Sequence, residues 1–125
     1  TQVILMRLDS DLYDIMNAVA TSTLDQVEVK WKDEQVTCVV LASGGYPGSY
    51  EKGKVITGLD NLPDDIVVFH AGTAMKDGQL VTNGGRVLNV CAAGKNLEET
   101  RDKVHKAIEK IHFDGMYCRK DIGLH

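Results

Sequence analysis

The sequence has no long hydrophobic run and no excess of positive charge, and each absence excludes a class of protein. No apolar segment approaches the ~20 residues that a membrane-spanning helix needs. The formal net charge of -4 argues against a protein that follows nucleic-acid phosphates, because such a surface normally carries a basic excess. We therefore expect neither a membrane nor a nucleic acid among its partners.

Cysteine is also scarce, with three residues at wide spacing: Cys38, Cys91 and Cys118. An odd number without a Cys-x-x-Cys pair indicates neither a disulfide framework nor a zinc site. Cys38 and Cys91 lie in apolar runs and are expected to be buried, whereas a reactive thiol is conceivable only at Cys118, beside two basic residues. Unpaired thiols and the lack of a signal peptide in residues 1–3 indicate the cytoplasm.

The chain has 125 residues, of which 43% are hydrophobic and 26% charged, as expected for one folded domain. Apolar spacing predicts helices over residues 12–22 and from Asn96 onward, with another helical stretch over residues 1–8. Strands are predicted over residues 27–32, 36–41, 54–57, 66–71, 73–76, 79–82, 86–92 and 116–118. This pattern predicts an α+β fold, a mostly antiparallel sheet with flanking helices.

Three local signals refine this prediction. Asp77-Gly78 between two strands predicts a type I′ hairpin. The 9–10 Asp-Ser pair can cap the helix that follows, which would place Asp11 in its first turn. Asn96 caps the last helix, in which Glu99 and Lys103 are spaced for an ion pair.

Two glycine-rich turns carry the best signal for a ligand site. Residues 41–53 contain four glycines and one proline after a predicted strand, and residues 83–86 read Asn-Gly-Gly-Arg. Glycines leave room for a group to approach the backbone, so we interpret the two loops as one wall of a small-molecule site. The alternative is that both loops only connect strands.

Positively charged and imidazole side chains near these loops are the candidate ligand contacts. Arg86 follows two glycines, and its guanidinium offers a planar set of donors to a phosphate or carboxylate. Arg119 and Lys120 are further candidates, and the alternative for each is a solvated surface charge. His70 can contact a ligand or be a satisfied structural residue, and no carboxylate or histidine cluster shows metal-ligand spacing.

Four motifs occur in the order typical of one enzyme family. They are ASGGYPGSY at 42–50, VFHAGT at 68–73, TNGGRVL at 82–88 and YCRKDIG at 117–123. Together they resemble the C-terminal part of the phosphoribosylamine–glycine ligases, which are ATP-grasp enzymes. The resemblance implies the ADP-forming ligation of glycine to 5-phosphoribosylamine in purine synthesis, with ATP and Mg²⁺ or Mn²⁺ as cofactors.

The resemblance also implies roles for individual residues. We expect no catalytic residue in this chain, and we expect its loops to hold the ribose phosphate. Arg86 is the expected phosphate contact, with an ion pair to Asp121 as the open alternative. Gln2 and Arg7 could face the same site. The other expected substrate-binding residues are Gly84, Gly85, Gly44, Gly45, Tyr46, Lys120 and Arg119.

The chain departs from the family pattern in one important respect. The segment resembling Asn-x-Arg-x-Gly-Asp-Pro-Glu, which carries the metal ligands, is absent. We expect residues 1–30 to be a helical segment that continues from an ATP-grasp domain, and residues 31–125 to be the C-terminal domain. Alone, the chain is expected to bind neither ATP nor metal, to be inactive, and to self-associate through its exposed N-terminal helix. The alternative is a stand-alone binding module, and the ending Leu124-His125 also departs from the family pattern.

Overall fold

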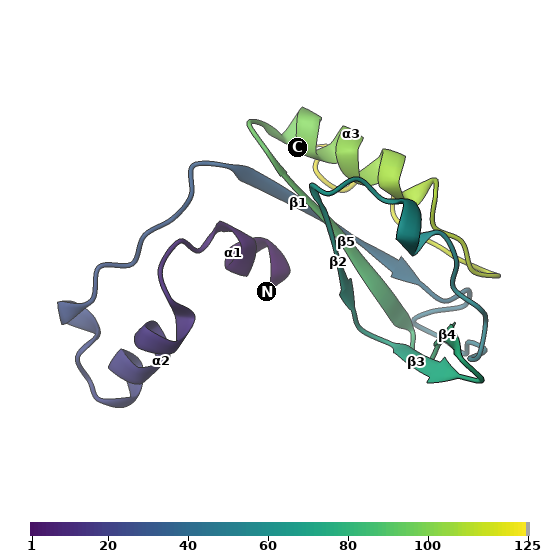
Figure 1. Cartoon of the computed structure of the whole chain (residues 1–125), viewed down its shortest axis with the longest axis horizontal. Helices are drawn as coiled ribbons and strands as arrows, with labels where there is room; N and C mark the ends of the chain where they lie inside the picture. The colour runs from purple at the N-terminus through teal and green to yellow at the C-terminus, as the bar shows by residue number, and fades with distance from the viewer. Residues whose placement is uncertain (125) are drawn as a thin grey trace.

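A three-stranded antiparallel sheet with a helix on one face organises the protein (Figure 1). The computed structural model describes residues 1–124. His125, the second residue of the ending that departs from the family pattern, lies outside them. The helices are α1 (Gln2–Arg7), α2 (Leu12–Ala20) and α3 (Leu97–Ile108), with single 3₁₀ turns η1 (Leu24–Gln26) and η2 (Leu59–Asn61). The strands are β1 (Gln35–Ala42), β2 (Ile66–His70), β3 (Thr73–Lys76), β4 (Gln79–Thr82) and β5 (Arg86–Gly94).

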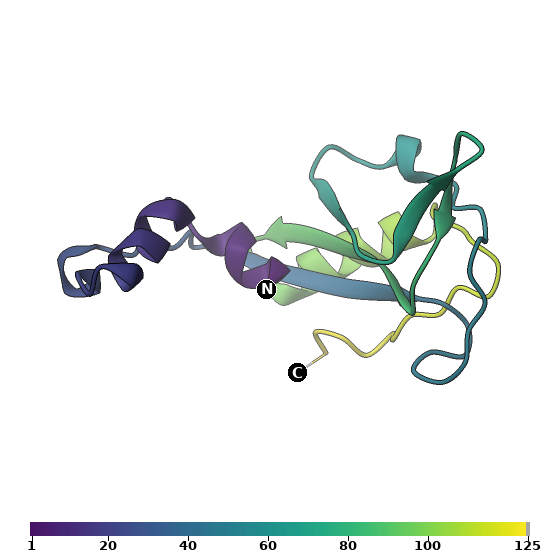
Figure 2. The same cartoon turned by 90° about the horizontal axis from the view of Figure 1, so that it is seen from below.

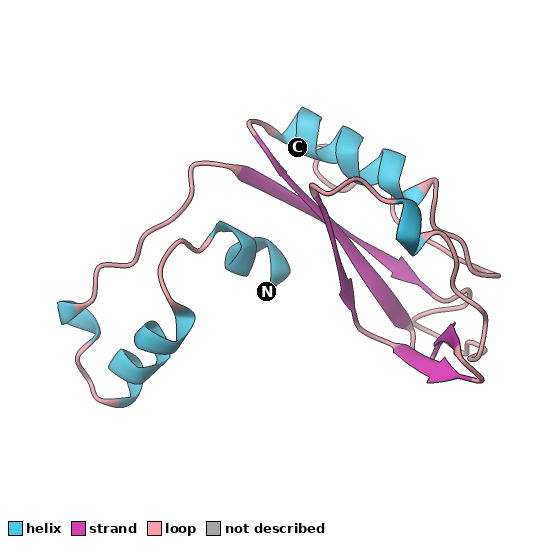
Figure 3. Cartoon of the chain, viewed as in Figure 1, coloured by secondary structure: helices cyan, strands magenta, loops and turns pink. Residues whose placement is uncertain are grey.

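The central strand is β5, which pairs with β1 on one side and β2 on the other, both antiparallel. Its residues are apolar and buried along most of its length because both strand edges and one face are covered. Helix α3 packs against this face, where Val104 and Ala107 join Val39 and Val90 of the sheet in a core that is closed by Phe113. The α+β fold predicted from the sequence is confirmed, and Figure 3 shows how much of the chain between β1 and β2 is loop.

The β3–β4 hairpin has the predicted turn. Asp77 and Gly78 both have positive φ, 51° and 76°, which is the conformation of a type I′ turn. Asp-Gly adopts it at low cost because glycine has no Cβ and aspartate tolerates the left-handed region.

The N-terminus of α3 is held by a reciprocal cap. The Asn96 Oδ1 accepts a hydrogen bond from the Glu99 amide at 2.9 Å, and the Glu99 carboxylate accepts one from the Lys95 amide at 2.9 Å. The predicted ion pair is present, with Lys103 Nζ 3.0 Å from Glu99 Oε1. The hydrogen bond from the Lys95 amide, followed by the one from Lys103, lowers the pKa of Glu99.

Replacing Glu99 with glutamine is expected to lower stability near neutral pH and to have less effect in acid. The lowered pKa means that this carboxylate stabilises the fold above its unfolded pKa of about 4.3, and that the contribution is lost as pH falls through the lower folded value. Urea unfolding of wild type and variant across this pH range measures the difference. Glu98→Gln is the control, because Glu98 belongs to the same first turn but its side chain makes no hydrogen bond or ion pair within residues 1–124. Equal losses for both variants at every pH would contradict the capping role.

Three predicted strands are wrong. Residues 27–32 alternate in polarity but have no partner strand, and only Trp31 forms an isolated bridge, to Leu8. Residues 54–57 bridge two different segments, and residues 116–118 are reduced to one bridge between Tyr117 and Ala42. In each case the sequence pattern is that of a strand, but a ladder also requires a neighbouring strand, which the pattern does not reveal.

The predicted cap of α2 is also corrected. Asp11, not residues 9–10, is the N-cap of α2, and its carboxylate accepts a hydrogen bond from the Tyr13 amide at 2.7 Å. Strand β2 is only half-buried, with Val67 38% exposed, because it lies at the edge of the sheet. Its apolar run resembled that of a buried strand.

Helix α2 and the turn η1 lie on an arm that extends away from the sheet (Figure 2). Helix α1 still contacts β1 and β5, whereas the main contacts of α2 with another element are with η1. Several apolar side chains of α2 face solvent, including Tyr13 (75% exposed), Met16 and Val19. Among residues 1–124, no helix has the length and hydropathy to span a membrane.

Candidate functional site

The two glycine-rich loops lie against each other, as the sequence predicted. Ser43, at the end of β1, donates from Oγ to the Gly84 carbonyl at 2.8 Å and from its amide to the Gly85 carbonyl at 2.8 Å. Gly84 in turn packs on Gly72, since a Cβ added to Gly84 would lie 2.9 Å from the Gly72 Cα. No larger residue fits between these backbones without a shift, so the glycines fix the distance between the loops.

Gly85 and Tyr46 shape the junction of the loops. The space that a Cβ on Gly85 would occupy is taken by the Tyr46 ring, and the Tyr50 ring lies 3.1 Å from the same point. The two rings are tilted by 57° with centroids 6.5 Å apart, a favourable aromatic geometry. The missing side chain of Gly85 therefore lets Tyr46 close over the loop.

The junction opens into a hollow of about 340 Å³, which we call the Arg86 pocket. Its floor comes from alternate residues of β1, and two guanidinium groups and two tyrosines stand around it. The lining residues are Cys38, Val40, Ala42, Tyr46, Pro47, Arg86, Tyr117, Arg119 and Ile122. Such a surface suits a ligand with an apolar body and a negative group.

The two arginines of the pocket differ in their partners. Arg119 forms a two-pronged ion pair with Asp121, with Nε 2.9 Å from Oδ1, and this partner raises the pKa of Arg119. Arg86 is exposed, and within residues 1–124 its guanidinium makes neither an ion pair nor a hydrogen bond. The predicted alternative, an ion pair between Arg86 and Asp121, is therefore wrong, because Asp121 pairs with Arg119. Arg86 has its donors available for an anion.

The remaining predicted residues do not line the Arg86 pocket. Gln2 lies with Arg86 at a neighbouring hollow of about 370 Å³, whereas Arg7 donates to the Lys32 carbonyl at 3.2 Å and lines a hollow on the arm. Lys120 is exposed beside Arg119 but does not line the Arg86 pocket. His70 bonds through Nδ1 to Thr73 Oγ1 at 3.0 Å, which fits the structural interpretation.

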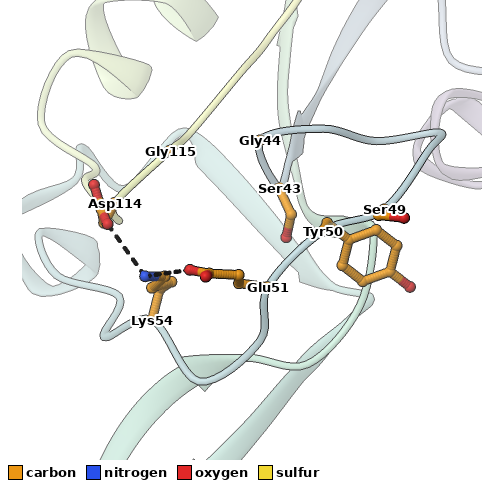
Figure 4. A pocket seen from close by; sticks show the side chains of 8 residues that line it. All are labelled: Ser43, Gly44, Ser49, Tyr50, Glu51, Lys54, Asp114 and Gly115. Carbon is orange, nitrogen blue, oxygen red and sulfur yellow. Dashed lines mark ion pairs between the residues drawn. The ribbon is translucent and has the colours of Figure 1, made fainter.

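Gly44 faces a different hollow, of about 330 Å³, shown in Figure 4. There Lys54 lies between Glu51 and Asp114, with Nζ to oxygen distances of 2.8 and 3.3 Å, and both carboxylates raise the Lys54 pKa. A lysine neutralised by two carboxylates is a poor anion site, which favours the Arg86 pocket. Gly45 does not line either hollow; its φ of 95° supports the turn before Tyr46.

Sequence reasoning missed the apolar floor of the Arg86 pocket. Val40 and Ala42 looked like core residues of a buried strand. Since alternate residues of a strand face opposite sides, and Thr37 bonds to Thr100 of α3, the even-numbered positions of β1 face away from α3. Strand periodicity was the available clue, but it could not tell that α3 packs on the opposite face of β1.

Comparison with known proteins identifies the family. The family described as "Phosphoribosylglycinamide synthetase, C domain" matches residues 36–125. The chain is 48% identical over 122 residues to phosphoribosylamine–glycine ligase of Agrobacterium fabrum and 51% identical over 125 residues to that of Phenylobacterium zucineum. It covers 29% and 30% of these relatives, and each match covers 98% of the chain.

A solved structure agrees with this match. The crystal structure of phosphoribosylamine–glycine ligase from Thermotoga maritima superposes with a TM-score of 0.69 and 43% sequence identity. The superposition covers 86% of this chain and 27% of that one. Fold, sequence and motif order agree, and the chain belongs to the phosphoribosylglycinamide synthetase C-domain family.

Proposed function

We propose that the chain is the C-terminal domain of a phosphoribosylamine–glycine ligase. The relatives that carry this name match 98% of the chain with 48% sequence identity, and the chain spans 29% of their length. The whole ligase would join glycine to 5-phosphoribosylamine and release ADP and phosphate. In this proposal the remainder of the ligase supplies the ATP site, and this domain helps to hold the phosphoribosyl group. A cytoplasmic location, as the free thiols suggest, belongs to the same proposal.

The unpaired Arg86 guanidinium is the observation that carries the assignment of the site. Beside it, the amides of Gly84 and Gly85 donate no hydrogen bond within residues 1–124. A phosphate placed there would receive charge-assisted hydrogen bonds from Arg86 and from these amides. The sugar would lie toward Tyr46 and the apolar floor. Arg119, already bound to Asp121, adds positive charge at longer range.

Metal chemistry is not assigned to this chain. Within residues 1–124 there is no group of three His, Cys, Asp or Glu side chains able to hold a metal ion. ATP and Mg²⁺ or Mn²⁺ would bind to the remainder of the ligase, where the metal would stabilise charge on the phosphates. The role of this domain is to bind and orient the substrate.

A chimera tests this function. The matching segment of the Agrobacterium fabrum ligase is replaced by this chain, and ADP release is measured with and without glycine and phosphoribosylamine. Release that requires both substrates is expected. A folded chimera that binds ATP but releases no ADP would contradict the proposed function.

The exposed side of α2 is proposed to pack against the remainder of the ligase, and to cause self-association when the chain is alone. Tyr13, Met16 and Val19 are 75, 56 and 54% exposed and lie on a helix whose main contacts with another element are with η1. Sedimentation velocity over a concentration series measures the association. We expect Met16→Glu to shift the chain toward monomer, and a wild-type chain that stays monomeric at high concentration would contradict the proposal.

A further inference from the structure

Cys38 and Cys91 lie directly opposite each other in neighbouring strands. The β1–β5 register pairs Cys38 with Cys91, between Val39–Val90 on one side and Thr37–Ala92 on the other. Directly opposite residues project to the same face of a sheet. The two thiols are free, and they share the sheet face that looks away from α3.

The hydrogen-bond pattern places these cysteines at a position of closest approach. Ala42 exchanges both backbone hydrogen bonds with Tyr117, at 2.8 and 2.9 Å, so its backbone groups point away from β5. Backbone direction alternates along a strand, so those of Cys38 also point away. The pair is therefore not hydrogen-bonded through its backbone.

Such pairs have a geometry that a disulfide can use. In antiparallel sheets their Cα atoms are about 4.5 Å apart, which lies within the range of about 4.4–6.8 Å seen for disulfides. The β1–β5 register already places the two free thiols directly opposite each other on the same face of the sheet. No movement of one strand relative to the other is needed to bring the sulfurs together.

The two thiols differ in access and acidity. Cys38 is half-buried and lines both the Arg86 pocket and the neighbouring hollow that contains Gln2, whereas Cys91 is fully buried. The hydrogen bond from the Cys91 thiol lowers the pKa of Cys38. The same hydrogen bond and burial raise the pKa of Cys91. An accessible, more acidic thiol beside a buried one is the arrangement of an attacking and a resolving cysteine.

We propose that Cys38 and Cys91 are a thiol–disulfide site that reacts with small disulfides such as glutathione disulfide. The Cys38 thiolate attacks one sulfur of the reagent, so a mixed disulfide forms and one glutathione leaves with the proton from Cys38. The Cys91 sulfur then attacks Cys38, and the second glutathione leaves with the proton from Cys91. Two thiols are oxidised to one disulfide, and one glutathione disulfide is reduced to two glutathione molecules.

This inference stands apart from the proposed function, because it depends only on the pairing of β1 with β5. Its consequence for the pocket is local: oxidation removes the Cys38 thiol from the pocket floor and links the two strands beneath it. Cys118 is the internal control. It lies outside both strands and is half-buried against the core.

The test incubates the folded 125-residue chain with excess glutathione disulfide, removes the reagent, blocks the remaining thiols with iodoacetamide in urea so that buried thiols also react, and maps the products by mass spectrometry. In wild type and in Cys118→Ser we expect a Cys38–Cys91 linked peptide and loss of alkylation at both residues. Cys91→Ser should stop at the glutathione adduct on Cys38. In Cys38→Ser, Cys91 should stay reduced, because its thiol is buried.

Several results would overturn the proposal. Full alkylation of Cys38 and Cys91 in the treated wild type would do so, as would a wild-type glutathione adduct that never closes. A link that forms only in urea, or one that includes Cys118, would show that the folded register does not direct the reaction. Circular dichroism before treatment establishes that each variant is folded, and Cys118→Ser preserves both reacting thiols if another variant fails to fold.

Discussion

Replacing Gly58 with alanine is expected to destabilise the fold by about 3 kcal/mol, while the same change at Gly53 costs about 1 kcal/mol. Both glycines have positive φ, 87° and 82°, so both variants place an alanine in the left-handed region. At Gly58 the new Cβ would also overlap the Lys110 carbonyl oxygen, whereas nothing lies within 4 Å of it at Gly53. Comparing the two variants separates the cost of an alanine with positive φ from the cost of the steric overlap with Lys110.

The overlap at Gly58 cannot relax easily. The chain segments that contain Gly58 and Lys110 are joined by reciprocal backbone hydrogen bonds between Thr57 and His112, at 2.9 and 3.1 Å. Ile111, which follows Lys110, is buried in the core. Moving Lys110 away would break this pairing. Urea unfolding of the two variants and wild type measures the effect. Equal losses at both positions would show that the contact between Gly58 and Lys110 does not form in solution.

Replacing Arg86 with alanine is expected to lower kcat/KM of the chimeric ligase for phosphoribosylamine by roughly 10- to 100-fold. A hydrogen bond to a charged group contributes about 1.5–3 kcal/mol, and each 1.4 kcal/mol is a factor of about ten. Arg119→Ala is the matched control. It removes a guanidinium of the same pocket that already binds Asp121, so we expect a smaller loss.

The stability of the same variants distinguishes a binding role from a structural one. The Arg86 side chain is exposed and its guanidinium has no polar partner within residues 1–124, so Arg86→Ala should leave the urea midpoint nearly unchanged. A large loss of stability with an unchanged KM for phosphoribosylamine would assign Arg86 to the fold. A larger kinetic effect of Arg119→Ala than of Arg86→Ala would place the phosphate nearer Arg119.

The sequence was most informative where the signal is local. The Asp77-Gly78 turn and the Asn96 cap were correct because each depends on residues within one turn of the chain. Residues 27–32 were wrongly predicted as a strand because pairing depends on a distant partner that a period of two does not reveal. The pairing of Cys38 with Cys91 was missed for the same reason, since register between strands is set by the whole sheet.

The candidate site was predictable in part. The composition of the two glycine-rich loops predicted that they approach each other, and the hydrogen bonds from Ser43 to Gly84 and Gly85 show this contact. The grouping of Arg86 with Arg119 was expected from the family resemblance and not from spacing, because residues 117–121 return to β1 through the bridge at Tyr117. Likewise, the ion pair between Asp121 and Arg119 depends on local geometry, which the number of charged residues does not reveal.

The most direct test of the central claim is a titration of the chain with glycinamide ribonucleotide, followed by the NMR shifts of its backbone amides. We expect the largest shifts at Gly84, Gly85, Arg86 and Tyr46, and we expect Arg86→Ala to remove them. The hollow around Lys54 should stay unchanged, because its charge is already neutralised by Glu51 and Asp114. Shifts centred on Lys54, or none at millimolar ligand, would contradict a phosphate site at Arg86 in this domain.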